Sequence, residues 1–314
     1  MTTHVLTANP THSRWNRSLP PRLRIASGDT VHMECVDSSG SQVHPAMTVA
    51  EFLTIDRGRI HALTGPIFVE GAGPGDVLQI DVLEVAHKGW GWSSVVNGLG
   101  FLKQRFTEPY LFHWKLDGAV TRSLAPAVVP VRPFCGVMGV ARAEDGEFTT
   151  RPPGPFGGNM DVRELCTGAT LYLPVLNLGA LFSAGDAHAA QGDGEVCING
   201  IECPADVTLR FYVHKNVPLA GPIVETGVPR KQEMEADQGS WIVVESAPDV
   251  AAAARAATSR MIDLLVKRWS FSEVHAYILC SVAMNLRLSQ VVNEPIFTVS
   301  AAVPKHVLPA QRLF

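Results

Sequence analysis

The chain has 314 residues and a mass of 33.9 kDa, with 46% hydrophobic and 18% charged residues. This composition supports a sizeable core and argues against a disordered chain or one built from long solvated helices. The 26 basic and 30 acidic residues give a net charge of −4, which excludes a strongly basic surface for nucleic acid or an anionic membrane.

Alternating apolar residues predict strands through most of the chain. Val77–Val85 alternates after the turn cluster Gly71–Asp76, and Asp206–Val213 alternates most strictly, as expected of half-buried strands. Leu171–Phe182 is a nearly continuous apolar run, which favours one strand buried on both faces and bent at its internal proline and glycine. Trp241–Glu245 is a further short strand.

Helices are predicted near the C-terminus. Asp249 is a suitable N-cap for an Ala-rich helix over Val250–Trp269. Ser270 followed by Glu273 matches a capping box and predicts a second helix through Val274–Arg287. Two helices after many strands indicate a mainly β (α+β) fold with a C-terminal helical pair. We expect an N-terminal β-rich domain at 1–130 and a second at 131–314 with the helices, or one interwoven unit.

Signals for export and membrane insertion are weak. The first residues lack the apolar stretch of a signal peptide, and no apolar run approaches the roughly 18 residues of a membrane-spanning helix. The six cysteines show no CxxC spacing. We therefore expect a cytoplasmic protein with reduced cysteines.

Common catalytic motifs are missing. The sequence contains no GxxxxGK[ST] loop, no GxGxxG fingerprint before a helix and no GxSxG elbow. Cys135 is a conceivable nucleophile, but its sequence neighbours suggest no base. These absences disfavour covalent catalysis and leave the acidic segments of the chain as candidates for a site.

Polar side chains gather in two glycine-rich segments, 157–161 (GGNMD) and 184–195 (AGDAHAAQGDGE). In an extended segment Asp186 and His188 would share one face, which would provide half of a site for Zn²⁺ or a similar ion. The two glycines before Glu195 would allow the chain to turn back toward that site. An acidic surface turn explains the same residues without chemistry. The absence of Lys and Arg in the second segment favours a bound cation.

These segments resemble the acetamidase/formamidase family. The resemblance extends over most of the chain, through His12–Pro21, Gly28–Asp29, Leu63–Asp76, Pro133–Val140, Pro152–Asp161, Gly185–Glu195 and Ser289–Val292. It implies hydrolysis of a short-chain aliphatic amide, formamide or acetamide, to a carboxylate and ammonia. It also implies β-barrel or jelly-roll-like layers. Two positions depart from the family pattern: Ala62 follows His61 where proline is usual, and Asn285 stands where the family usually has a helical Asp.

A metal-assisted mechanism is consistent with these residues. The hypothesis assigns metal binding to Asp161, Asp186 and His188, acid–base catalysis to Glu195, and substrate binding to Asn159, Gln191 and His61. Zinc is the favoured ion, with calcium, manganese or iron as alternatives. Glu202 is a further possible site member.

Structural roles compete with several of these assignments. Asp161 could instead cap a helix at Val162–Leu165, His188 could be a hydrogen-bonded core residue, and Glu195 could orient His188.

Two other functions compete with the amidase. One is a metal-assisted hydrolase of a larger amide or a carbamate, and the other is a non-catalytic small-molecule binding protein. The partners expected are a small amide and further copies of the chain in a homo-oligomer, without nucleic acid or membrane. The sequence leaves open the exact amide, the metal, the oligomeric state and the effect of Ala62 and Asn285.

Overall fold

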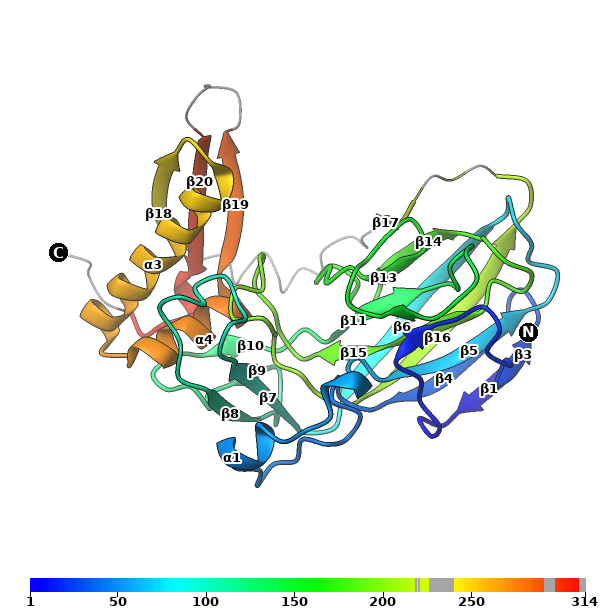
Figure 1. The fold of residues 1–314 in the computed structure, drawn as a ribbon, viewed down its shortest axis with the longest axis horizontal. Helices are drawn as coiled ribbons and strands as arrows, with labels where there is room; N and C mark the ends of the chain where they lie inside the picture. Colours follow the sequence, from blue (N-terminus) through cyan, green and yellow to red (C-terminus); the bar gives the residue numbers. More distant parts are fainter. Residues whose placement is uncertain (218, 220, 226–239, 291–296, 311–314) are drawn as a thin grey trace. The chain divides into compact units, whose positions relative to one another are not determined.

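The computed structural model describes residues 1–217, 219, 221–225, 240–290 and 297–310 (Figure 1). The chain forms two compact units, each assembled from three stretches. The first unit comprises Met1–Lys88, Pro133–His188 and Glu202–Val228, and the second comprises Gly89–Arg132, Ala189–Ile201 and Pro229–Phe314. The sequential division at residue 130 stays a prediction, because compactness alone does not test which parts fold independently.

Two open sheets build the first unit. The larger has the order β1 (Thr3–Leu6), β4 (Thr30–Cys35), β16 (Ala205–His214), β6 (Val77–His87), β14 (Thr170–Pro174), β17 (Ile223–Glu225). The smaller has the order β13 (Gly157–Asn159), β11 (Phe134–Gly139), β15 (Phe182–His188), β5 (Leu63–Val69), β3 (Leu23–Ile25). A short pair, β12 (Phe148–Thr149) and β2 (Arg14–Trp15), and the helical turns α1 (Val49–Phe52) and η1 (Arg57–Arg59) complete this unit.

The two sheets pack face to face around an apolar core. Val207, Leu209 and Phe211 of β16 are buried, which confirms the predicted alternation. The ring of Phe211 meets Phe182 of β15 edge-on, with the ring centres 5.2 Å apart. The predicted strand at Val77–Val85 is confirmed as part of β6. Layered sheets were expected, and the strand orders of the described residues leave each sheet open instead of closed into a barrel.

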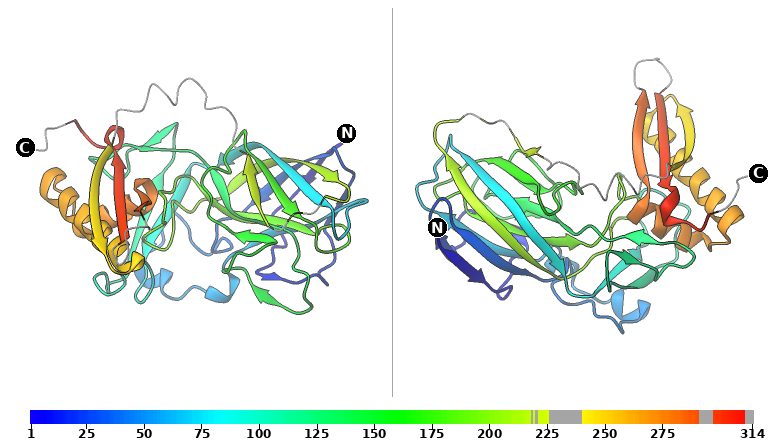
Figure 2. Two further views of the ribbon diagram at one scale, coloured as in Figure 1. Left: turned by 90° about the horizontal axis from the view of Figure 1, so that it is seen from above. Right: turned by 180° about the vertical axis from the view of Figure 1, so that it is seen from behind.

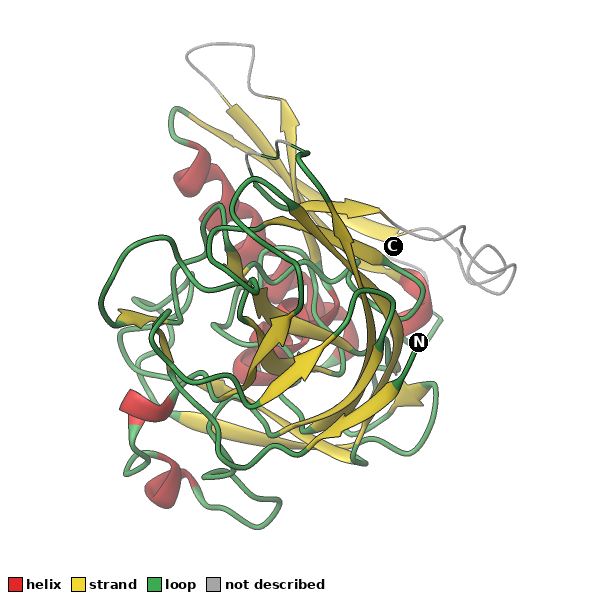
Figure 3. Cartoon of the chain, turned by 90° about the vertical axis from the view of Figure 1, so that its right-hand side faces the viewer, coloured by secondary structure: helices red, strands yellow, loops and turns green. Residues whose placement is uncertain are grey.

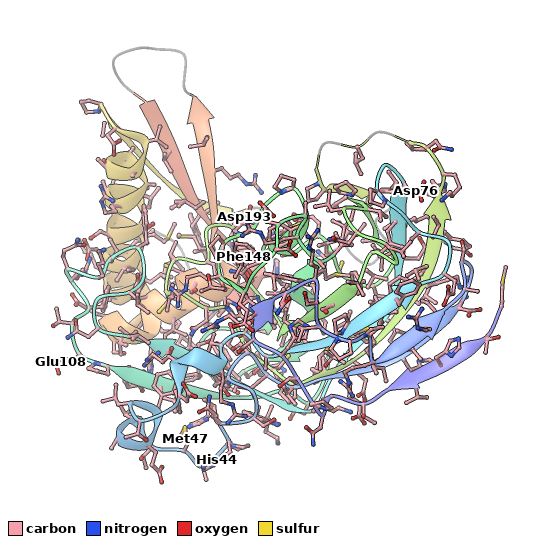
Figure 4. The ribbon with its side chains drawn as sticks, turned by 45° about the vertical axis from the view of Figure 1, so that its right-hand side comes forward. His44, Met47, Asp76, Glu108, Phe148 and Asp193 are labelled. Carbon is pink, nitrogen blue, oxygen red and sulfur yellow. The ribbon has the colours of Figure 1, made fainter. Side chains whose placement is uncertain are left out.

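A turn network holds the end of the β6–β16 pair. Asp76, labelled in Figure 4, accepts hydrogen bonds from the backbone amides of Gly73 and Asn216 and pairs with Lys215, whose Nζ lies 2.6 Å from Asp76 Oδ2. Asp76 is 4% exposed, and these three partners compensate its buried charge. These contacts fix where β6 begins and β16 ends.

The apolar run Leu171–Phe182 is two strands, not one bent strand as predicted. β14 ends at Pro174 and β15 begins at Phe182. Between them Gly179, Ala180 and Leu181 all have positive φ, between 57° and 75°, and such backbone cannot continue a strand. The apolar character of this turn reflects burial of Ala180 and Leu181, which periodicity alone cannot distinguish from a strand.

The second unit combines small sheets with two helices. β7 (Trp90–Val95) pairs with β8 (Tyr110–Lys115), and β9 (Val120–Thr121) pairs with β10 (Val129–Pro130). A three-stranded sheet has the order β18 (Ser240–Ala247), β20 (Phe297–Pro304), β19 (Asn285–Gln290). Helix α3 (Val250–Trp269) covers one face of this sheet, as both views in Figure 2 show, and α4 (Glu273–Ala283) and η2 (Lys305–Val307) follow in the chain. The predicted strand at Trp241–Glu245 is confirmed within β18.

The helix boundaries confirm one prediction and correct another. Asp249 caps α3 as predicted, since its side chain accepts a hydrogen bond from the amide of Ala252. The predicted cap Ser270 instead ends α3 in the left-handed region at φ 58°, and Ser272 caps α4. Helix α4 ends at Ala283, short of the predicted Arg287, because the chain becomes extended at Met284 and residues 285–290 pair with β20 as β19.

Strands form most of the regular structure, as the colouring of Figure 3 shows, which confirms the mainly β fold with a C-terminal helical pair. Asn285 is the first residue of β19, whereas the resemblance places an Asp in a helix at this position. Val291 and Val292, the last residues of the SQVV match, lie outside the described residues. In the described ranges, every helix is too short or too polar to span a bilayer.

Candidate functional site

The centre of the candidate site lies on β15 of the first unit. The Oδ1 atom of Asp186 lies 3.5 Å from Nε2 of His188, so the two side chains predicted to share a face do converge. The backbone route differs from the prediction, because Asp186 has φ 55° and is not extended. Asp186 and His188 are 2% and 1% exposed. A buried carboxylate–imidazole pair therefore lies inside the β-sandwich.

Glu202 joins this pair from the strand segment opposite. His188 and Glu202 form an isolated antiparallel β-bridge, and Nε2 of His188 lies 3.0 Å from Oε1 of Glu202. Glu202 is 2% exposed, and its Oε2 atom has no hydrogen-bond partner among the described residues. A buried carboxylate between Ile201 and Cys203 costs free energy unless a proton or a cation compensates it. In the sequence, the feature that indicates a role for Glu202 is a single charged residue in an apolar run.

Asp161 reaches the same group from the loop after β13. The backbone amides of Met160 and Asp161 both donate to the carbonyl oxygen of Gly136 on β11, at 3.1 and 3.2 Å. This attachment aligns Asp161 so that ligand atoms of Asp161, Asp186 and His188 all lie within 4.8 Å of one another. No helix forms over 162–165, so Asp161 is not the N-cap that the alternative required.

His61 lies against the opposite oxygen of Asp186. Its Nε2 atom is 3.9 Å from Oδ2 of Asp186, and its backbone amide donates to Oγ1 of the buried Thr150. Its Nδ1 atom is buried without a hydrogen-bond partner among the described residues. The structure therefore brings His61 to the carboxylate cluster itself.

Gly136 leaves space for the cluster, and this role of Gly136 was not predicted from the sequence. A Cβ atom at this position would lie 2.6 Å from Oδ1 of Asp161, 2.8 Å from Oδ2 of Asp186 and 3.0 Å from Cε1 of His188. All three distances are at or below the closest approach of real Cβ atoms. The available signal was a glycine inside a buried strand, which often marks close approach by another group.

Burial and mutual charge shift the ionisation of the cluster. Burial raises the pKa of Asp161 to about 7, and Asp186 adds to that rise. Burial likewise raises the pKa of Glu202 to about 7 against the effect of His188. Burial alone would raise the pKa of Asp186, but the imidazoles of His61 and His188 hold it below its usual value. Clustered, perturbed acids of this kind are typical of functional sites.

The remaining predicted residues lie in two places. Asn159 ends β13, and its Oδ1 atom is buried without a hydrogen-bond partner among the described residues. Gln191 and Glu195 lie on the segment Ala189–Ile201, which leaves the first unit after His188, belongs to the second unit, and returns at Glu202. The chain turns at Glu195, which has φ 40°.

Cys135 is a poor nucleophile in this environment. A hydrogen bond with Cys35, together with burial, raises the pKa of Cys135 well above its usual value. Because the thiolate is the reactive form, this thiol is inert at neutral pH. All six cysteines are free.

The fold and the cluster define a β-rich protein with a candidate centre for a divalent metal ion. The model of the Acetamidase/Formamidase family matches residues 2–145 and 142–309. The chain belongs to this family.

Individual relatives support the membership of this family or share its fold. A formamidase from Methylophilus methylotrophus is 28% identical over 60% of this chain and 60% of its own length. An acetamidase from Bacillus halodurans, known from its crystal structure, is 32% identical over 96% of this chain and 97% of its own, with a TM-score of 0.68. A gamma lactamase from Delftia acidovorans, at 23% identity over 98% of this chain and 94% of its own, shares the fold with a TM-score of 0.90. The chain spans less than two thirds of the length of the curated relatives it matches.

Proposed function

We propose that this protein hydrolyses a short-chain aliphatic amide, formamide or acetamide, to a carboxylate and ammonia. The observation that carries the proposal is the convergence of Asp161, Asp186 and His188 over Gly136. These residues come from the segments that match the family, and family relatives include a formamidase and an acetamidase. A purely structural cluster would not require three ionisable groups around one glycine, two of them buried.

The residues fit a divalent metal ion. We assign its ligands to Asp161, Asp186 and His188, and we add Glu202 because its buried Oε2 atom lacks a hydrogen-bond partner among the described residues. Carboxylate and imidazole donors suit zinc best, with manganese, iron or calcium as alternatives. Such an ion, when bound, supplies Lewis-acid stabilisation for negative charge that develops on the amide oxygen. Because the pKa values of Asp161 and Glu202 are raised to about 7, metal binding would compete with protons at these two carboxylates near neutral pH.

The chain's own groups carry the proton transfers in this proposal. Glu195 accepts a proton from the attacking water and donates one to the departing amide nitrogen, so that the products are a carboxylic acid and ammonia. Gln191 and Asn159 donate hydrogen bonds that hold the amide oxygen. His61 completes the substrate site from its position beside Asp186. A well-placed acid–base group contributes about 10²–10⁴-fold to such a reaction.

Ammonia release tests the activity. We expect release from formamide and acetamide and a steep fall as the acyl chain lengthens. Glu195→Gln should retain bound metal and lose about 100-fold or more in kcat. Glu108→Gln is the matched control, because Glu108 is an exposed carboxylate of the same unit (Figure 4). Equal activity of the two variants would remove Glu195 from its role. Activity on larger amides or carbamates alone would replace the substrate class.

Assembly and location are proposals that follow from composition. We propose a homo-oligomer, since the low charge content leaves apolar surface available for contacts between copies. We also propose a cytoplasmic location, which six free cysteines support. Light scattering at several protein concentrations measures the mass directly. A monomer mass at all concentrations would contradict the oligomer.

A further inference from the structure

Helix α4 presents two buried hydroxyl groups to the segment Ala189–Ile201. Tyr277 OH donates to the carbonyl oxygen of Val196 at 2.6 Å and accepts from the amide of Leu102 at 2.9 Å. Ser281 Oγ donates to the carbonyl oxygen of Asn199 at 2.6 Å and accepts from the amide of Cys197 at 3.1 Å. Residues four apart lie on one helix face, so one turn of α4 holds both hydroxyls.

The segment is held from β7 as well. Ser93 Oγ donates to the carbonyl oxygen of Gly200 at 2.5 Å. The side-chain amide of Asn199 exchanges two hydrogen bonds with Ser94, one with its backbone amide and one with its hydroxyl, both at 2.9 Å. Ser93, Ser94 and Asn199 are all buried. Side chains therefore bind the backbone of residues 196–200 from two elements of the second unit.

The other end of the segment is fixed by backbone contact with α4. The amide of Gly192 donates to the carbonyl oxygen of Ser281 at 2.8 Å. A Cβ atom at Gly192 would collide with the carbonyl oxygen of Met284, so only glycine permits this approach. Asp193 follows at the turn (Figure 4), and the amide of Glu195 donates to the carbonyl oxygen of Gly192 at 3.2 Å. Glu195 thus lies between two anchored points, Gly192 and Val196.

We propose that Tyr277 and Ser281 are positioning residues, which hold Glu195 in place for proton transfer by fixing the backbone on its C-terminal side. This inference rests on the proposed function, since it takes Glu195 as the acid–base group. Proton transfer needs a heavy-atom separation of about 2.6–3.2 Å, and a misplacement of about 1 Å can cost about 10²-fold in rate. Glu195 occupies a left-handed conformation that a non-glycine residue adopts only when its surroundings enforce it.

The two hydroxyls suit this role because each bridges a donor and an acceptor of the main chain. Burial raises the pKa of Tyr277, so its phenol keeps the proton that it donates to Val196. The ring of Tyr277 stacks on Phe106, with ring centres 4.2 Å apart, and this packing remains when only the hydroxyl is removed. Tyr277→Phe is therefore a clean probe of the hydrogen bonds.

The experiment compares three variants of the full chain. Tyr277→Phe and Ser281→Ala each remove a hydroxyl that holds the segment. Thr258→Val removes an equally buried hydroxyl, which donates to the carbonyl oxygen of Ala254 within α3. For formamide hydrolysis we expect kcat of the first two to fall about tenfold or more below that of Thr258→Val, with KM within about twofold of wild type. Thermal unfolding confirms that all three variants are folded.

A second comparison separates positioning from general stability. In the Glu195→Gln background, removal of either hydroxyl should lower the residual kcat by less than about twofold, because the group being positioned is already gone. A full tenfold loss in that background would overturn the inference, and so would a kcat equal to that of Thr258→Val in the wild-type background. Failure of the proposed function has a different signature, because wild type itself would then release no ammonia from formamide. Failure of the role of Glu195 alone would leave Glu195→Gln at wild-type turnover.

Discussion

The Nε2 atom of His188 lies 3.0 Å from the Oε1 atom of Glu202, across a β-bridge between the ends of two buried strand segments. Both side chains are nearly inaccessible to solvent. Burial would lower the pKa of His188, but the carboxylates of Glu202 and Asp186 outweigh it and raise the pKa well above its usual value. The pair therefore fixes the imidazole next to Asp186 and links the two ends of the segment that carries Glu195.

Removal of the Glu202 carboxylate should weaken the metal site. For Glu202→Gln we expect metal affinity to fall by at least about 10–100-fold, the loss that is typical when a partner of a ligating His is removed, because Glu202 is also one of the proposed ligands. Titration with Zn²⁺ under competition by a chelator measures the change. Glu84→Gln is the control, because Glu84 is exposed on β6. Equal affinities of the two variants would remove Glu202 from the site.

Gly136→Ala should disrupt the cluster without adding or removing a charge. The added methyl group would meet Asp161, Asp186 and His188 at 3.0 Å or less, so we expect a loss of about 1–3 kcal/mol in unfolding free energy. Metal content should fall with it. Gly118→Ala is the control, because nothing lies within 4 Å of its added methyl group. If both variants bind metal as wild type does, the cluster is not as tight as described.

The turn between β14 and β15 provides a test of packing. A methyl group at Gly179 would lie 2.1 Å from the ring of Phe68, whereas one at Gly71 meets nothing within 4 Å. Both glycines have φ near 75–79°, so the strain of the left-handed backbone is common to both substitutions. Gly179→Ala should therefore be less stable than Gly71→Ala by about 1–3 kcal/mol in urea unfolding. Equal losses would mean that Phe68 moves aside freely.

Asp29 should make stability depend on pH in the acid range. It accepts hydrogen bonds from His4 Nε2 at 3.0 Å and from the amides of Thr2 and Ala26. The hydrogen bond from His4 has the largest effect. Together these bonds lower the pKa of Asp29 to about 2, against about 3.9 in an unfolded chain. A carboxyl with a lowered folded pKa stabilises the fold above its unfolded pKa, and this contribution is lost as the pH falls through the folded value.

Unfolding of wild type and Asp29→Asn in urea checks this window. The stability advantage of wild type should be constant above about pH 4 and shrink between about pH 4 and pH 2. An advantage that stays constant down to pH 2 would contradict the lowered pKa.

The sequence predicted those features that depend on short-range pattern. The alternation in β16 and the cap at Asp249 are local and are confirmed. Asp186 and His188 converge as predicted, although Asp186 is not extended. The predicted C-terminal end of α4 was wrong, because pairing of residues 285–290 with β20 outweighs a helical pattern in that segment.

The site was predictable only in part for the same physical reason. Asp161, Asp186 and His188 stand in polar, glycine-rich segments that composition makes visible. Gly136 belongs to an apolar strand, and its role arises from contacts with residues 25 or more positions away. The partnership of His188 with Glu202 likewise depends on a β-bridge that no local pattern encodes. Long-range register, not residue type, explains why Gly136 was missed and why Glu202, named only as a possible site member, lies beside His188.

The most direct test of the metal-assisted amidase is a paired measurement on the purified protein: divalent metal per chain by elemental analysis, and ammonia released from formamide, both before and after chelation. We predict about one divalent ion or more per chain, loss of ammonia release when a chelator removes it, and recovery when Zn²⁺ is returned. Full ammonia release from a protein without stoichiometric metal would contradict the account.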